Sequence, residues 1–368
     1  MRILHISSEA TWRGGEQQIA YLIQESMSRG QAVEVLCKSD SAFQNWCEEQ
    51  SIPYRTAPFK NSFDLYSAWK LRSYIRDSRI DLIHIHSGKG HGVFALSTLL
   101  GVRTPAILSR RVDFPLKNNP WSRWKYGLSQ IKHILCVSDA IRALVLEKVS
   151  DPERVSTIHS GIDLSRFEHL KPKSLHEQYD IPRNRMLIGN VAALAPHKDY
   201  RTFIRTAERC VDSGLPVHFF IIGEGDERSM IESEISRSGL QSHVTMTGFL
   251  QDIPAVLAGL DLFLISSETE GLGTSILDAF AAGTPVIATA AGGIPEIVIH
   301  EQTGLLCPIK DDQCLAFSVK RLLDDTDLKE RLRIGATEHL QQFTKQTVAQ
   351  QTLAVYEEVL SALPSKTK

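Results

Sequence analysis

The chain lacks any uninterrupted stretch of about 18 apolar residues, the length that a membrane-spanning helix requires. Its longest uncharged stretch, residues 279–295, is broken by glycines and prolines and reads as a buried strand with flanking turns. The first ten residues contain too short an apolar run for a signal-peptide core, so they predict a first β-strand. We therefore expect a cytoplasmic protein, at most peripheral at the inner face of a membrane.

Cysteine is scarce and scattered: six residues in 368, with no Cys-x-x-Cys pair. This excludes metal sites with the usual cysteine spacing and argues against a secreted disulfide framework in so long a chain. A net charge of −2, without a recognisable nucleic-acid-binding module, argues against nucleic acid as a partner. At 42% hydrophobic and 23% charged residues, the composition is that of an ordinary globular protein, and the length suggests two domains.

The small net charge hides an asymmetry between the two halves. Residues 1–165 carry 21 Lys and Arg against 16 Asp and Glu, whereas residues 166–368 carry 20 against 27. The basic excess is concentrated from Arg103 to Lys132, a segment with seven basic residues, one acidic residue and four aromatic residues. This basic segment suits a phosphorylated or lipid-linked acceptor or an anionic membrane surface, and equally a solvated basic face.

Short runs of Ile, Val and Leu alternate with helix-length amphipathic segments, which predicts parallel sheets covered by helices on both faces. The pattern occurs twice. The strands expected in the first set are 2–7, 32–37, 82–86, 106–109 and 133–137, and those in the second are 186–191, 217–222, 244–247, 262–265 and 286–289.

The break between the two sets falls in a segment with prolines and charges but no strong apolar period. We therefore expect an N-terminal Rossmann-like domain at 1–166, a linker at 167–185 and a C-terminal Rossmann-like domain at 186–345. Residues 346–368 are expected to form a helix that packs back across the domains. Ligands of doubly wound sheets bind beyond the carboxyl ends of the strands, so the default active site is the cleft between the domains.

Two motifs in the first half follow predicted strands. Gly14 and Gly15 come after the first strand and open a helix, where glycine lets the backbone approach a ligand and the helix N-terminus offers N–H groups to an anion. A tight strand–helix turn is the alternative. The loop is not the GxGxxG fingerprint, which disfavours a dehydrogenase. His86 ends a strand and would face the cleft, although a lone histidine is more often structural.

In the second half, Lys198 follows the first strand and can neutralise a phosphate, unless it is simply solvated. Glu270 and Asp278 flank a glycine-rich exit from strand 262–265. Backbone N–H groups there would form an anion cradle, and the two carboxylates would accept hydrogen bonds from sugar or ribose hydroxyls. The glycine-rich exit runs through Gly271, Leu272, Gly273 and Thr274, and Thr274 or Ser275 could cap the helix that follows.

In their order and spacing, these motifs resemble the large retaining glycosyltransferase family 4, with a GT-B fold of two Rossmann-like doubly wound α/β domains. The residues that carry the resemblance are 14–16, His86, 159–163 with Phe167, 222–226 and 270–278. The resemblance implies transfer of a sugar from a nucleotide-diphosphate-sugar donor in the C-terminal domain to an acceptor in the N-terminal domain. The expected acceptor is a glycan or lipid-linked envelope intermediate, and no cofactor and no metal are expected.

The resemblance also implies roles for single residues. Glu270 and the backbone of 271–274 would hold the donor sugar and phosphates, and Asp278 the ribose hydroxyls. Lys198 would stabilise the leaving diphosphate, Gly14 and Gly15 would close on it, and His86 would lie near the reacting sugar.

Two positions depart from the family pattern. Asp278 stands where glutamate is usual, and an arginine usual shortly before Lys198 is replaced by alanine at 192 and 193. The candidates to supply the missing cation are Arg201, Arg205, His197, Arg110 and Arg111.

We expect retention at the anomeric carbon without a metal ion, since no Asp-x-Asp motif follows a predicted strand. Two alternatives stay open: a nucleotide-sugar 2-epimerase, which would need no acceptor, and a non-catalytic sugar-nucleotide-binding protein.

Overall fold

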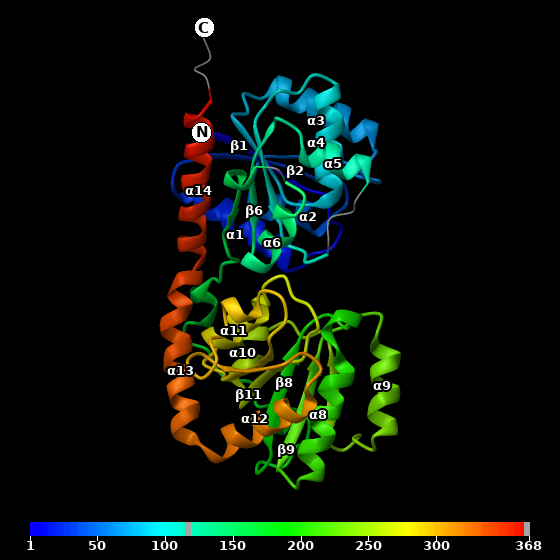
Figure 1. Cartoon of the computed structure of the whole chain (residues 1–368), viewed down its shortest axis with the longest axis vertical. Helices are drawn as coiled ribbons and strands as arrows, with labels where there is room; N and C mark the ends of the chain where they lie inside the picture. The colour runs from blue at the N-terminus through cyan, green and yellow to red at the C-terminus, as the bar shows by residue number, and fades with distance from the viewer. Residues whose placement is uncertain (115–118, 150, 364–368) are drawn as a thin grey trace. The chain divides into compact units, whose positions relative to one another are not determined.

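The computed structural model describes residues 1–114, 119–149 and 151–363 (Figure 1). The chain divides into two compact units: unit 1 combines Met1–Gly161 with Lys345–Lys368, and unit 2 comprises Ile162–Thr344. Part of the basic segment, residues 115–118, and the last five residues of the expected C-terminal helix lie outside the described residues. Among the described residues, no helix has the length and apolarity that crossing a bilayer requires.

Unit 1 contains a parallel sheet of seven described strands in the order β3-β2-β1-β4-β5-β6-β7. The central strands are buried on both faces, which is why their sequences are almost continuously apolar. The strands are β1 (Arg2–Ser7), β2 (Ala32–Lys38), β3 (Tyr54–Ala57), β4 (Leu82–Ile85), β5 (Ala106–Arg110), β6 (Ile131–Cys136) and β7 (Val155–Thr157). The chain reverses its direction of winding between β1 and β4, so the sheet has its switch point there.

Helices cover both faces of this sheet, and one of them comes from the far end of the chain. Leu353, Tyr356 and Val359 of the last helix pack on apolar side chains of β1, β4, β5 and β6, so this helix belongs to unit 1 (Figure 1). The helices of unit 1 are α1 (Gly14–Ser28), α2 (Ala42–Glu49), α3 (Leu65–Asp77), α4 (Gly88–Leu99), α5 (Pro120–Tyr126), α6 (Asp139–Leu146) and α14 (Lys345–Ser361).

Unit 2 contains a second parallel sheet, of six described strands in the order β10-β9-β8-β11-β12-β13. Its switch point lies between β8 and β11. The strands are β8 (Met186–Val191), β9 (Val217–Ile222), β10 (Val244–Gly248), β11 (Leu262–Ile265), β12 (Val286–Thr289) and β13 (Leu305–Cys307). The helices are α7 (Leu175–Gln178), α8 (Tyr200–Asp212), α9 (Arg228–Arg237), α10 (Ile253–Ala258), α11 (Thr274–Ala281), α12 (Asp312–Asp324) and α13 (Thr326–Leu340).

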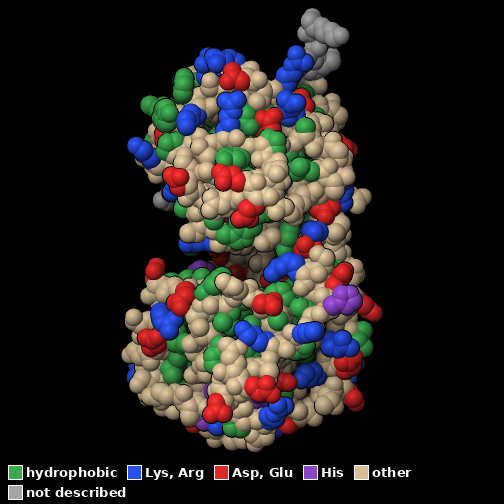
Figure 2. All heavy atoms as spheres, turned by 180° about the vertical axis from the view of Figure 1, so that it is seen from behind, with side chains coloured by type: hydrophobic (Ala, Val, Ile, Leu, Met, Phe, Trp, Pro, Cys, Tyr) green, Lys and Arg blue, Asp and Glu red, His purple; other side chains and the backbone are tan. Residues whose placement is uncertain are grey.

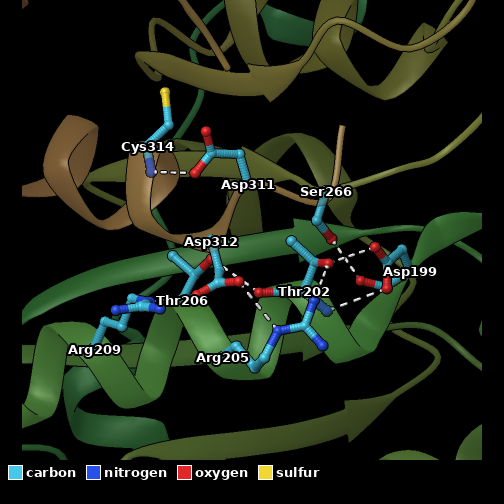
Figure 3. A network of polar contacts seen from close by, with 9 residues as sticks. All are labelled: Asp199, Thr202, Arg205, Thr206, Arg209, Ser266, Asp311, Asp312 and Cys314. Carbon is cyan, nitrogen blue, oxygen red and sulfur yellow. Dashed lines mark hydrogen bonds and ion pairs between the residues drawn. The ribbon is translucent and has the colours of Figure 1, made fainter. Parts of the chain in front are cut away.

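A polar network joins α8 to α12 on the surface of unit 2 (Figure 3). Asp199 caps α8 by accepting a hydrogen bond from the Thr202 N–H at 3.1 Å. Asp312 of α12 pairs with Arg205, at 3.1 Å, and with Arg209. The network holds α8 in place directly after the loop that carries Lys198.

Unit 2 contains a disulfide, although the scattered cysteines argued against a disulfide framework. Cys307 at the end of β13 and Cys314 in the first turn of α12 form a disulfide, with their Cα atoms 5.7 Å apart. The six intervening residues match no sequence motif. Only the turn from β13 into α12 brings the two side chains within the range that a disulfide spans.

Candidate active site

The candidate site of unit 2 lies at the carboxyl edge of its sheet, at the switch point between β8 and β11. Lys198 ends a short 3-10 turn (Pro196–Lys198) after β8, and Glu270 lies in the loop after β11. Because β8 and β11 are neighbours in the sheet, their exits bring these two residues together. Open α/β sheets bind ligands at this kind of position.

Lys198 Nζ donates directly to Glu270 Oε1, and the two side chains are only 15% and 9% exposed. Ser267 Oγ donates to the same carboxylate oxygen at 2.9 Å. Lys198 is therefore a largely buried, paired ammonium group and not a solvated surface lysine. Removing either partner from such a pair leaves an uncompensated charge in a poorly hydrated place.

Backbone hydrogen bonds join the loops around this ion pair. The Glu268 N–H donates to the His197 carbonyl at 2.8 Å, and Ser266 Oγ donates to the Lys198 carbonyl at 3.1 Å. The Gly293 N–H donates to the Glu270 carbonyl at 3.0 Å. The exits of β8, β11 and β12 thus form one connected cluster of loops.

Two glycines are required by the geometry of this cluster. Gly292 has a φ of +53°, and a Cβ atom there would lie 2.0 Å from the Glu270 carbonyl oxygen. Gly273 has a φ of +85° and is the N-cap of α11, where no side chain caps the helix. The first-turn N–H groups of α11 therefore have no side-chain acceptor, which suits the binding of an anion. The predicted cradle accordingly begins a helix, with Leu272 buried beneath it.

Asp278 lies one turn further along α11. Burial raises the pKa of its carboxyl to about 6, and the guanidinium of Arg166, 3.6 Å away, opposes that rise. The carboxylate form is thus poorly solvated in the protein alone. Hydrogen-bond donors such as ribose hydroxyls would stabilise it.

The candidates for the missing cation are now placed. Arg201 pairs with Glu234 at 3.7 Å. Arg205 pairs with Asp312 (Figure 3), so both arginines of α8 are engaged in ion pairs. His197 adjoins Lys198 in the loop cluster. Arg110 and Arg111 belong to unit 1.

In unit 1, the predicted residues also lie at the switch point. Gly14 and Gly15 begin α1 directly after β1, and the Arg13 N–H donates to Glu16 Oε2 at 3.2 Å across the start of this helix. A Cβ atom at Gly15 would meet no atom within 4 Å, so packing does not demand glycine there.

His86 follows β4 and is buried beside two other histidines. Its Nε2 lies 2.9 Å from Nδ1 of His5 on β1, and its ring centroid lies 3.9 Å from that of His84 on β4. Burial lowers the pKa of His5 to about 3 and those of His84 and His86 well below the usual value. All three imidazoles are therefore neutral at physiological pH.

Each histidine of this trio offers a ring nitrogen, and these nitrogens lie within 4.8 Å of one another, a spacing that suits a metal ion. Both ring nitrogens of His84 are already bonded, one to the Tyr356 hydroxyl and the other to Ser109 Oγ at 2.8 Å. The positive charge of Arg111 also acts on His84 and His86. These contacts favour a hydrogen-bonded trio over a cation site.

Sequence reasoning did not single out His5 or Arg111 as partners of His86. A signal for His5 exists: it lies opposite His84 in the pairing of β1 with β4. That register is visible only once the strand order is known.

A model of glycosyl transferases group 1 matches residues 173–339, and a model of glycosyltransferase family 4 matches residues 12–166. The chain is 30% identical over 268 residues to a 2-deoxystreptamine glucosyltransferase of Streptomyces kanamyceticus, which covers 71% of this chain and 68% of that protein. It is 22% identical over 362 residues to the lipopolysaccharide core biosynthesis glycosyltransferase LpsD of Rhizobium meliloti, covering 97% and 98%.

Among solved structures, Anabaena HepE in complex with UDP-glucose matches with a TM-score of 0.84 at 23% identity, covering 97% of this chain and 100% of that one. The two doubly wound units are those of the GT-B fold, so the expected fold is confirmed. The chain belongs to glycosyltransferase family 4, within the glycosyl transferases group 1. It is a glycosyltransferase, and neither the epimerase nor the non-catalytic alternative finds support.

The close approach at Gly292 predicts a specific loss of stability. Gly292→Ala should destabilise unit 2 by clearly more than the roughly 1–2 kcal/mol that positive φ alone costs a residue with a Cβ atom. The matched control is Gly283→Ala, because Gly283 also has a positive φ, +74°, but open space around it. Urea unfolding of the two variants measures the difference, and equal losses would contradict the close contact.

Proposed function

We propose that the protein transfers a sugar, with retention and without a metal ion or cofactor, from a nucleotide-diphosphate-sugar to an acceptor hydroxyl. The observation that carries the proposal is the buried Lys198–Glu270 pair next to the uncapped start of α11. An ammonium group and free helix N–H groups form the set that neutralises a diphosphate. The match to Anabaena HepE, solved with UDP-glucose, supports a donor of this class.

Each residue has a distinct task in this proposal. Lys198 and the N–H groups of residues 271–274 stabilise the charge that develops on the leaving diphosphate. Glu270 holds Lys198 in place and accepts a hydrogen bond from a sugar hydroxyl. Asp278 accepts from the ribose hydroxyls. Gly14 and Gly15 close on the diphosphate, and His86 lies near the reacting sugar.

In the chemical step that we propose, the bond between the anomeric carbon and the diphosphate breaks. The acceptor oxygen then bonds to that carbon on the same face, and a diphosphate oxygen takes the acceptor proton. Lys198 keeps its own proton throughout and acts as a fixed positive charge. The Asp-x-Asp sequence that the chain does contain lies elsewhere: Asp325 caps α13 by accepting from the Leu328 N–H at 2.8 Å. It therefore has a structural role of its own.

For the acceptor, we propose a glycan or lipid-linked envelope intermediate, met at the cytoplasmic face of an anionic membrane. The similarity to a lipopolysaccharide core glycosyltransferase supports this class. So does an apolar–basic surface of unit 1 that includes part of the basic segment (Figure 2). It is formed by exposed apolar side chains of α3 and of the residues before it, by half-buried Trp121 and by cations. Its members are Phe63, Leu65, Tyr66, Trp69, Trp121, Lys60, Lys70 and Arg123.

Contacts within this surface connect α3 to the basic segment. The rings of Phe63 and Trp121 lie 4.5 Å apart, and the Lys70 ammonium lies 5.3 Å from the ring of Tyr66. Phe63 and Trp69 are 60% and 53% exposed. Aromatic side chains flanked by cations are the composition that binds the interface of an anionic bilayer.

The diphosphate role of Lys198 predicts a loss of rate. Lys198→Met should lower kcat by roughly 100-fold or more, the usual effect of removing one group that stabilises developing charge. The assay follows nucleoside diphosphate release from the donor that gives the largest shift in a thermal screen. The control is Lys320→Met, since Lys320 pairs with Asp324 on the surface of the same unit. A Lys198→Met enzyme that keeps nearly full kcat would rule out this role.

The ribose role of Asp278 predicts a pH dependence. Its raised pKa of about 6 means that the carboxylate is lost as pH falls through 6, so donor affinity should weaken below that value. Asp278→Asn should bind donor weakly at every pH, without this inflection. Because a raised carboxyl pKa makes the ionised form a cost to folding above pH 6, the variant should unfold no earlier than wild type at pH 7.5. Calorimetric donor titration from pH 5 to 8 tests this, and a wild-type affinity that is flat with pH would reject it.

The apolar–basic surface predicts binding to lipid vesicles. Changing both Phe63 and Trp69 to Ser should weaken binding to phosphatidylglycerol vesicles by at least about tenfold, because each side chain would bury apolar area in the bilayer interface. Phe317→Ser is the control, since Phe317 is 66% exposed on α12 of unit 2. Vesicle co-sedimentation measures the effect. Binding that is indifferent to the double change, or equal on neutral phosphatidylcholine vesicles, would contradict the proposal.

A further inference from the structure

His5 is a buried titratable group to which the proposed mechanism assigns no task. It lies on β1 with no solvent exposure, and its Nδ1 is 2.9 Å from Nε2 of His86. The two rings are nearly parallel, at 12°, with their centroids 5.2 Å apart. The backbone supports the contact, because the His86 N–H donates to the carbonyl of Ile6, the neighbour of His5, at 3.0 Å.

The hydrogen bond constrains the protonation pattern of both rings. Burial keeps both imidazoles neutral, so each carries one N–H. One of the two facing nitrogens must therefore carry the proton and the other must be bare. The Nε2 atom of His86 is used in this bond, and its Nδ1 is buried without a hydrogen-bond partner among the described residues.

Resting on the proposed function, we propose that His5 is a positioning residue that fixes the ring rotation of His86 and ties its tautomer to its own, which leaves Nδ1 as the working nitrogen toward the sugar. If His5 donates, His86 presents an Nδ1–H donor. If His86 donates, it presents a bare Nδ1 acceptor. The Nε2 atom of His5 is also buried without a partner among the described residues, so the bond allows both patterns and couples the two rings.

The surroundings of His86 leave this task to His5. His84, the other neighbouring histidine, has both nitrogens bonded elsewhere, to Tyr356 and Ser109. Arg111 acts on His86 through its charge, and its own Nη1 donates to Ser160 Oγ at 3.4 Å. Among the described residues, His5 is the hydrogen-bond partner of the His86 ring.

Three substitutions of His5 separate positioning from packing. Asparagine carries its amide where Nδ1 lies in histidine, so His5→Asn should keep the bond to His86. Glutamine carries its amide near the place of Nε2, so His5→Gln is equally polar but should not keep the bond. His5→Leu removes every polar atom. The control is His133→Leu, because His133 of β6 bonds Ser156 Oγ at 2.8 Å outside the site.

We expect His5→Leu and His5→Gln to lower kcat for nucleoside diphosphate release at least tenfold, with the Kd for UDP-glucose unchanged within about twofold. His5→Asn should recover most of the rate. The ¹⁵N spectrum of His86 should show a hydrogen-bonded Nε2 in the wild type and His5→Asn, and an Nε2 without this bond in the other two. His133→Leu should match wild type in both measurements.

An unchanged hydrogen-bonded Nε2 signal of His86 in folded His5→Gln, or equal rates for His5→Asn and His5→Gln, would overturn the proposal. The ¹⁵N spectrum can be recorded without any catalytic turnover, so it tests the role of His5 separately from the proposed function. If wild type released no diphosphate, the proposed function would fail while the ¹⁵N comparison still decided the role of His5.

Discussion

The ion pair between Lys198 and Glu270 is the interaction on which the rest of the candidate site depends. It joins the exits of two strands that are neighbours only because the sheet reverses its winding between them. Its two charges are largely buried, so each is tolerated because the other is present. The hydrogen bonds that hold the loops, and the glycine that passes Glu270 without a side chain, keep that partnership in one geometry. A preorganised cation of this kind stabilises developing charge without reorganising during the reaction.

Both units place polar side chains at the switch point of a parallel sheet, but the chemistry of these side chains differs. At the switch point of unit 2 the key groups are charged, whereas at that of unit 1 three imidazoles are kept neutral by burial. The overall charge of each half does not predict this. The acidic half holds the cation proposed for the diphosphate, and the basic half buries its histidines uncharged. The burial and the partners of each side chain decide its charge at the site. The net charge of each half of the chain reflects mainly its exposed residues.

Sequence patterns predicted the central strands and the edge strand β10 well, and missed the edge strands β3, β7 and β13. Strands β1, β8, β9, β11 and β12 have the expected bounds. Each is buried on both faces, and such strands have nearly continuous apolar sequences that are easy to delimit. Strand β3 is half exposed and β7 and β13 have three residues each, so they leave too little apolar signal. Helix α4 is glycine-rich and buried on nearly every side, and therefore shows no amphipathic period.

The residues of the site followed the same division. Lys198, Glu270, His86 and the glycines could be selected as candidates because each follows a strand that the sequence predicts clearly. The partners of these residues could not be predicted from the sequence. The contact of His5 with His86 depends on the strand order and register. The pairing of Arg205 with Asp312 depends on the packing of two helices, and the two residues are 107 positions apart in the chain. Contacts between segments distant in sequence leave no periodic trace in either one.

The most direct test of the account is a double-mutant cycle on the ion pair, measured as kcat for nucleoside diphosphate release by wild type, Lys198→Met, Glu270→Gln and the double variant. If Glu270 acts mainly by holding Lys198 at the diphosphate, the two changes are strongly coupled, and the double variant loses far less rate than the product of the two single losses. Losses that simply multiply would show that the two residues act independently. That result would contradict the central claim.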